Sequence, residues 1–95
     1  MVWQFSEADL RRLAGDSRFE RGQQLVDAVD AEMYDDEFSV CGTVRDGQAY
    51  LAMVHHCRPM SGECPCPDGG PPHCCEHSVA VGLAYLYDYG VIEPT

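Results

Sequence analysis

The stretch that most constrains this chain runs from Cys64 to His77 and reads CPCPDGGPPHCCEH. One residue separates Cys64 from Cys66, eight residues follow, and one residue separates Cys75 from His77, giving C-x-C-x8-C-x-H. Three thiols and one imidazole are the ligand set of a closed, tetrahedral structural zinc site. The pattern therefore predicts one structural Zn²⁺, held by Cys64, Cys66, Cys75 and His77.

The spacer between the two ligand pairs is rich in residues that form tight loops. Prolines stiffen it and a pair of glycines allows its reversal (Pro65, Pro67, Pro71, Pro72; Gly69, Gly70). A helical pattern starts directly after His77, so the second ligand pair is expected at a helix N-terminus. The helix dipole and free N–H groups there favour thiolates, and a site of three thiolates and Zn²⁺ carries one net negative charge.

The motif and its flanks resemble the SWIM zinc-finger family, whose ligands follow the pattern C-x-C-xn-C-x-H. Residues 79–86 (VAVGLAYL) are similar to that family's downstream helix, and Phe19–Gly22 (FERG) is similar to a helix common in its bacterial members. The resemblance spans roughly residues 16–90, nearly the whole chain. It implies a ββα-like zinc module that binds protein or nucleic acid and performs no chemistry.

Carried over position by position, the resemblance implies the same four ligands, Cys64, Cys66, Cys75 and His77. Cys74 is an alternative to Cys75, because Cys74-x-x-His77 can also bind a metal. The resemblance favours Cys75, which leaves Cys74 as an additional thiol. His73 is a reserve ligand, although a solvated loop histidine is the simpler interpretation.

The filled ligand shell argues against catalysis. A catalytic zinc keeps one position open for water, and thiolate ligands make the metal a weak Lewis acid. Glu76 lies near the ligands in sequence, but no pattern indicates a substrate pocket beside it. Neighbouring cysteines such as Cys74 and Cys75 rarely form an unstrained disulfide, which argues against redox chemistry. We therefore expect no enzyme and no small-molecule substrate.

The net charge of the chain indicates whether its partner is a protein or a nucleic acid. The net charge is −10, from 16 acidic and 6 basic residues, and such a field repels polyanions. In the SWIM family the residue between the last two ligands is often basic, whereas here it is Glu76. Another protein is therefore the expected partner. The alternative is a nucleic-acid-binding finger that uses an N-terminal patch of Arg11, Arg12, Arg18 and Arg21.

The expected compartment is the reducing cytoplasm. The first residues lack the basic and apolar regions of a signal peptide, and no apolar run approaches the roughly 20 residues that span a bilayer. In a reducing compartment clustered cysteines and histidines indicate metal ligands, whereas the same six cysteines in a secreted miniprotein would allow a disulfide framework. Away from the motif, Cys41 and Cys57 are expected to be buried small side chains. His55 or His56 is a candidate to hydrogen-bond a ligand sulfur.

The remaining patterns predict an α+β fold in one domain, residues 1–95, with a zinc-binding core at about 59–90. Capping boxes at Ser6 and Ser17 begin two helices; Gly15 ends the first, and the second runs to about Val29. Gly22 is expected to mark a close approach of that second helix to a sheet. The last helix should start at 74–76, run to about Asp88 and bury a stripe of Val79, Leu83 and Leu86.

Between the helices we expect a small antiparallel sheet of three or four strands. Residues 38–45 alternate, Asp46-Gly47 predicts a type I′ turn, and 48–56 form the return strand. This turn would pair Val44 with Ala49 and Val40 with Met53. One apolar face would then combine Phe38, Val40, Val44, Leu51 and Met53. Short strands at 32–34 and 59–63 complete the sheet.

Overall fold

The computed structural model describes residues 6–30, 34–35, 39–55, 61–64 and 75–88. It confirms the α+β class, with a four-stranded antiparallel sheet whose strand order β1-β2-β3-β4 follows the chain. The elements are α1 (Glu7–Ala14), α2 (Asp16–Leu25), a 3-10 turn η1 (Val26–Ala28), β1 (Tyr34–Asp35), β2 (Ser39–Asp46), β3 (Gln48–His55), β4 (Ser61–Glu63) and α3 (Glu76–Asp88).

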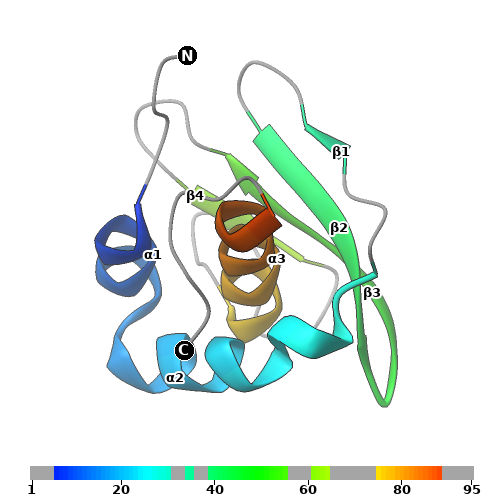
Figure 1. Ribbon diagram of the computed structural model, residues 1–95. Helices are drawn as coiled ribbons and strands as arrows, with labels where there is room; N and C mark the ends of the chain where they lie inside the picture. Colours follow the sequence, from blue (N-terminus) through cyan, green and yellow to red (C-terminus); the bar gives the residue numbers. More distant parts are fainter. Residues whose placement is uncertain (1–5, 31–33, 36–38, 56–60, 65–74, 89–95) are drawn as a thin grey trace.

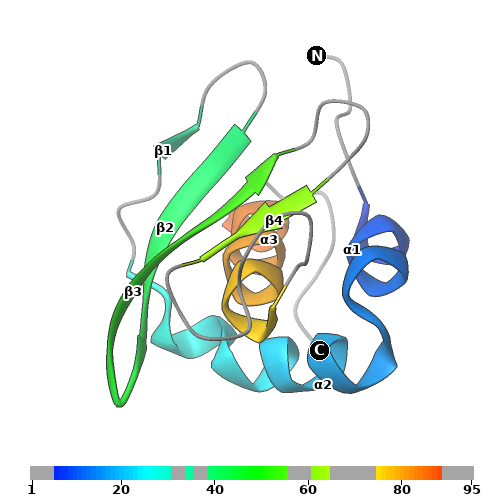
Figure 2. The same ribbon diagram turned by 180° about the vertical axis from the view of Figure 1, so that it is seen from behind.

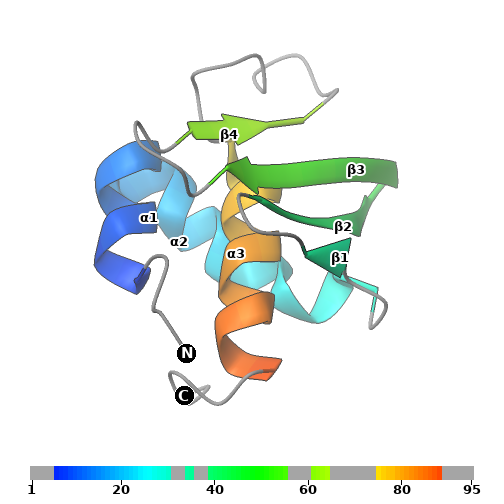
Figure 3. The ribbon, with the colours of Figure 1, turned by 90° about the horizontal axis from the view of Figure 1, so that it is seen from above.

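Helix α3 runs through the middle of the molecule. The sheet covers one side of it, and α1 and α2 pack on other sides (Figures 1 and 3). The predicted stripe of Val79, Leu83 and Leu86 is fully buried, but every residue from His77 to Leu86 is buried as well. A helix that is covered on all sides needs apolar residues all round, which explains the run of Val, Ala, Leu and Tyr. The predicted end of the helix is confirmed at Asp88, and the residues beyond it lie outside the described part.

The first capping box is confirmed. Ser6 Oγ accepts from the Asp9 N–H at 3.2 Å, and the Ser6 N–H donates to Asp9 Oδ2 at 2.9 Å. Gly15, with φ of 89°, ends α1 and also serves as the N-cap of α2, where its carbonyl accepts from the Phe19 N–H at 2.9 Å. The predicted second capping box at Ser17 is wrong. Because the glycine turns the chain so sharply, α2 begins at Asp16 and Ser17 already lies inside the helix.

Helix α2 is shorter than predicted, and the element that it approaches closely at Gly22 is not the predicted one. It ends at Leu25, where η1 follows, so the segment up to Val29 is not one α-helix. The predicted close approach at Gly22 is to α3 and not to the sheet. A Cβ built on Gly22 would overlap Val79 Cγ1 and lie 3.0 Å from the Glu76 carbonyl oxygen.

The β2–β3 hairpin has a register one residue away from the predicted one. Asp46 pairs with Gln48 and Val44 with Tyr50, with Gly47 between the strands at a φ of 81°. Among the described residues only Gly15 and Gly47 have positive φ, so Asp46 cannot be a central residue of a type I′ turn. The predicted turn type and register are therefore wrong.

The shifted register changes which side of β3 faces the core. Ala52 and Val54 are fully buried beside Val40 and Val44 of β2, whereas Leu51 is 52% exposed. The predicted placement of Leu51 and Met53 on the buried face is therefore wrong, and Phe38 lies outside the described residues. A slip of one residue exchanges the two faces of a strand. Figure 2 shows this sheet from behind, with α3 beyond it.

Candidate metal centre

Cys64, Cys75 and His77 form a buried cluster that can hold a metal ion. Their ligand atoms all lie within 4.8 Å of one another. His77 Nδ1 is 3.6 Å from Cys64 Sγ and 3.7 Å from Cys75 Sγ. The three residues are 5%, 0% and 5% exposed, respectively. Of the other predicted or alternative ligands, Cys66, Cys74 and His73 lie outside the described residues.

The fold brings the two sulfurs together at the meeting point of β4 and α3. Cys64 directly follows β4, which runs antiparallel to β3 and toward the β2–β3 turn. Cys75 precedes α3, and its carbonyl accepts the first helical hydrogen bond from the Val79 N–H at 3.1 Å. Ser78 Oγ donates to the Glu63 carbonyl at 3.2 Å and so ties the first turn of α3 to the end of β4. The prediction that Cys75 and His77 lie at a helix N-terminus is confirmed.

The two sulfur–nitrogen separations in the cluster match tetrahedral coordination. Zn–S bonds of about 2.3 Å and a Zn–N bond of about 2.0–2.1 Å at tetrahedral angles place S and N about 3.6 Å apart. The two observed separations are 3.6 and 3.7 Å. An imidazole nitrogen offers one lone pair, which suits a single hydrogen bond, yet two sulfurs lie equally close to it. The three atoms are therefore close enough together to share one cation.

The comparisons with known proteins come out negative. No family model, curated protein or solved structure matches the chain. Within the described residues, no helix combines the length and apolar character needed to cross a bilayer.

Two residues of the β2–β3 hairpin contact the His77 ring. Asp46 Oδ2, at the end of β2, lies 3.0 Å from His77 Nε2. The Tyr50 ring of β3 stacks on the imidazole with centroids 4.4 Å apart and an interplanar angle of 26°. Gln48 in turn donates to the Tyr50 hydroxyl at 2.8 Å. The sequence signalled neither contact, because Asp46 is 31 positions from His77 and reads as a turn residue.

The predicted hydrogen bond from His55 or His56 to a ligand sulfur stays a prediction, because His56 and Cys66 lie outside the described residues. His55 pairs with Ser61 at the first residue of β4, whereas Cys64 follows the last. At about 3.3 Å per residue, this places Cys64 about 10 Å along the strand from the level of His55. At His77 Nε2 the hydrogen-bond partner is Asp46 Oδ2. Cys41, expected to be buried, is half-buried, and Cys57 is outside the described part.

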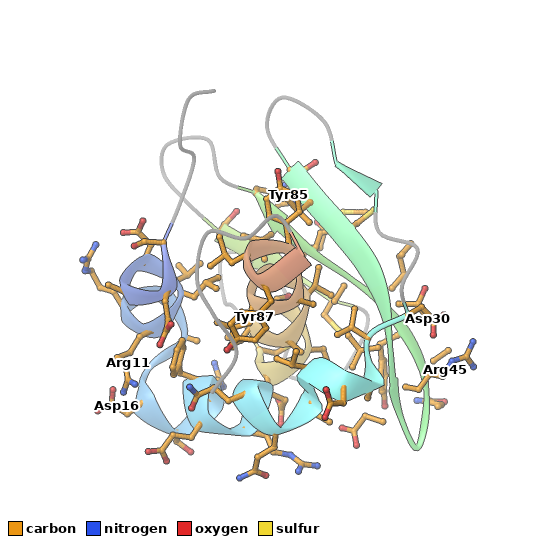
Figure 4. The ribbon with its side chains drawn as sticks, viewed as in Figure 1. Arg11, Asp16, Asp30, Arg45, Tyr85 and Tyr87 are labelled. Carbon is orange, nitrogen blue, oxygen red and sulfur yellow. The ribbon has the colours of Figure 1, made fainter. Side chains whose placement is uncertain are left out.

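Three of the four arginines of the predicted basic patch lie beside carboxylates of the same chain. Ion pairs join Arg11 to Asp16 at 3.2 Å, Arg12 to Asp9 at 3.2 Å and Arg21 to Asp46 at 3.5 Å. Arg18, the fourth member, is half-buried. Figure 4 shows Arg11 beside Asp16 on one side of the molecule and Arg45 beside Asp30 on the other.

This pairing lowers the positive potential that the arginines present to solvent. Within the described ranges, Arg45 and Asp30 form the shortest arginine ion pair, at 2.9 Å. The hydrogen bond and charge of Asp30 raise the pKa of Arg45. Each such pair carries no net charge, so it offers little attraction to a phosphate backbone.

Proposed function

We propose that the chain is a structural zinc module in which Cys64, Cys66, Cys75 and His77 hold one Zn²⁺. The observation that carries this proposal is that two sulfurs approach the same nitrogen, Nδ1 of the buried His77. Thiolates and imidazole suit zinc better than they suit magnesium or calcium, which prefer oxygen ligands. The C-x-C-x8-C-x-H spacing supplies Cys66 as the fourth ligand, as the SWIM resemblance implies.

The role proposed for the metal is to organise the fold and not to catalyse a reaction. Cys64, Cys75 and His77 are at most 5% exposed, and a catalytic zinc keeps a position open to water and substrate. Structural zinc contributes on the order of 10–16 kcal/mol in small peptides at neutral pH, because binding and folding are coupled. Here the ion would join the end of β4 to the start of the central helix. Free thiols persist in a reducing compartment, so we propose a cytoplasmic location.

Metal analysis combined with substitution of single ligands tests the proposal. The purified protein is expected to contain one zinc per chain, and Cys64→Ser, Cys66→Ser and Cys75→Ser are each expected to lose it. Cys41→Ser is the matched control, because Cys41 lies on β2 outside the cluster, and it should keep the metal. Cys74→Ser separates the two candidate ligands. A fully folded protein without metal, or a protein whose cluster sulfurs are joined to one another, would overturn the proposal.

We further propose that the metal-stabilised fold binds another protein. The net charge of −10 and the arginine–carboxylate pairs argue against a polyanion as partner. Leu51 on the exposed face of β3 is a large apolar side chain, 52% exposed, that a protein surface can cover. The expected result is a stoichiometric protein partner that binds the wild type and is lost on Leu51→Asp, with zinc content unchanged. Salt-dependent binding of DNA or RNA, without such a partner, would favour the arginine patch instead.

A further inference from the structure

We infer that Asp46 is a positioning residue of the metal centre, which fixes His77 as a ligand through Nδ1. The inference depends on the proposed metal site and adds to it the ligating atom and the side chain that selects this atom. Asp46 belongs to neither half of the C-x-C-x8-C-x-H motif and reaches the site only through the fold.

The hydrogen bond between the two side chains determines where the imidazole proton lies. A carboxylate oxygen accepts from an N–H group, so the separation of 3.0 Å suits the His77 tautomer that carries its proton on Nε2 and donates to Asp46 Oδ2. A neutral imidazole carries one proton, and Nδ1 is then the unprotonated nitrogen. The structure directs this nitrogen to the sulfurs of Cys64 and Cys75. The proton on one side of the ring thus leaves a lone pair for the metal on the other side.

Further contacts hold this arrangement in place. The stacked Tyr50 ring covers one face of the imidazole, which restricts its rotation. Arg21 Nη2 of α2 lies 3.5 Å from Asp46 Oδ1, so one carboxylate oxygen faces the arginine while the other faces His77. The His77 side chain is 6% exposed and that of Asp46 is 31% exposed, so water competes weakly for the hydrogen bond at the histidine end. The imidazole is therefore oriented by residues of α2, β2 and β3.

Outer contacts of this kind have a known effect on metal binding. A carboxylate that accepts from the second nitrogen of a metal-bound histidine fixes the tautomer and increases the donor strength of the ring. Losing such a partner typically lowers metal affinity about 10–100-fold. A residue that only shaped the hairpin would alter stability without changing which nitrogen binds the metal.

The first experiment measures zinc affinity of the full chain by competition with a chromophoric chelator. Asp46→Ala is expected to weaken zinc binding about 10–100-fold. Asp46→Asn keeps an oxygen that can accept from Nε2, so it should recover part of this loss. Asp30→Ala is the matched control, because it also removes an aspartate paired with an arginine but does not contact the cluster, and its affinity should stay within about threefold of wild type.

The second experiment needs no variant and identifies the nitrogen directly. In the zinc-loaded, ¹⁵N-labelled wild type, long-range ¹H–¹⁵N correlation is expected to show a proton on His77 Nε2 and none on Nδ1. A proton on Nδ1, with Nε2 bound to zinc, would overturn the inference. So would zinc affinities of Asp46→Ala and Asp30→Ala that equal that of the wild type. These outcomes leave the zinc site itself intact, whereas a wild type that binds no zinc overturns the proposed function and the inference together.

Discussion

Replacement of Gly22 by alanine tests the contact between α2 and the central helix α3. A Cβ on residue 22 would overlap Val79 Cγ1, lie 2.6 Å from Val79 Cβ and lie 3.0 Å from the carbonyl oxygen of Glu76. Two of these three atoms are close to the backbone of α3, and Val79 is β-branched and fully buried. Neither helix can accommodate the methyl group by a side-chain rotation alone, so the helices must move apart.

The expected change in the free energy of unfolding on Gly22→Ala combines two opposing effects. Glycine to alanine inside a helix gains about 1 kcal/mol of intrinsic helix propensity. Overpacking of a well-packed core costs about 1–3 kcal/mol, and the stiff, partly backbone contact favours the upper end of this range. The net loss of unfolding free energy should be about 2 kcal/mol. For a domain of this size, a loss of this magnitude lowers Tm by roughly 8–16 °C.

Gly82 of α3 provides the matched control. A Cβ there would lie 2.9 Å from each Cδ atom of Leu10 and 3.4 Å from Val54 Cγ2, and these atoms are the ends of side chains. Leu10 can shift its terminal methyl groups, so an overpacking cost of about 1 kcal/mol is offset by the gain in propensity. Gly82→Ala is therefore expected to stay within about 1 kcal/mol of wild type.

Thermal and urea unfolding of both variants, each with saturating zinc, measure the difference. Saturation matters because a ligand that binds only the folded state adds its own contribution to stability. A Gly22→Ala protein as stable as the wild type, or a larger loss for Gly82→Ala, would refute the close helix–helix contact.

Three further outcomes are expected from the structure. Ser6→Ala should cost about 1 kcal/mol in chemical unfolding because it removes the oxygen that caps α1; Ser17→Ala should stay within about 0.5 kcal/mol, and an equal loss at both serines would contradict the observed start of α2. Removing zinc with a chelator should reduce the helical circular dichroism signal as α3 loosens, whereas an unchanged spectrum after complete removal would argue against a structural ion. Burial and the charge of Glu7 raise the pKa of Tyr87 above its ordinary value of 10.0, so the folded protein keeps a proton that the unfolded chain loses. Stability should therefore fall as pH rises above about 10, and Tyr87→Phe should reduce this slope in urea unfolding; an identical slope would contradict the raised pKa.

Features governed by neighbours along the chain were predictable. The capping box at Ser6, the helix end at Gly15 and the extent of α3 depend on residues within a few positions. The same holds for the Cys75–His77 pair, which the motif spacing and the following helix indicate. Of the four predicted ligands, three converge in the structure, and Cys66 stays a prediction because it lies outside the described residues. The SWIM resemblance also stays a prediction, since no comparison matches the chain.

Features that depend on distant packing were not predictable. Both faces of β3 are apolar enough to be buried, so the pattern could not decide between Leu51 and Ala52. The single glycine between the paired residues of the hairpin set the register, and the central helix α3 covers the face with the smaller side chains. The contact of Gly22 with α3 also depends on distant packing. The glycine indicated that another element approaches α2 closely, but the sequence did not show that this element is α3.

The sequence by itself determined the α+β class and the types and spacing of the residues that could hold a metal, because these follow from donor chemistry and from periodicities of a few residues. The tertiary structure decided which atoms of those residues face one another. The register of the hairpin places Asp46 and Tyr50 beside His77, and no local pattern encodes a contact between residues 31 positions apart. The sequence therefore specifies which cysteine and histidine side chains are offered, whereas the orientation of the His77 imidazole arises only when the helices and strands pack together.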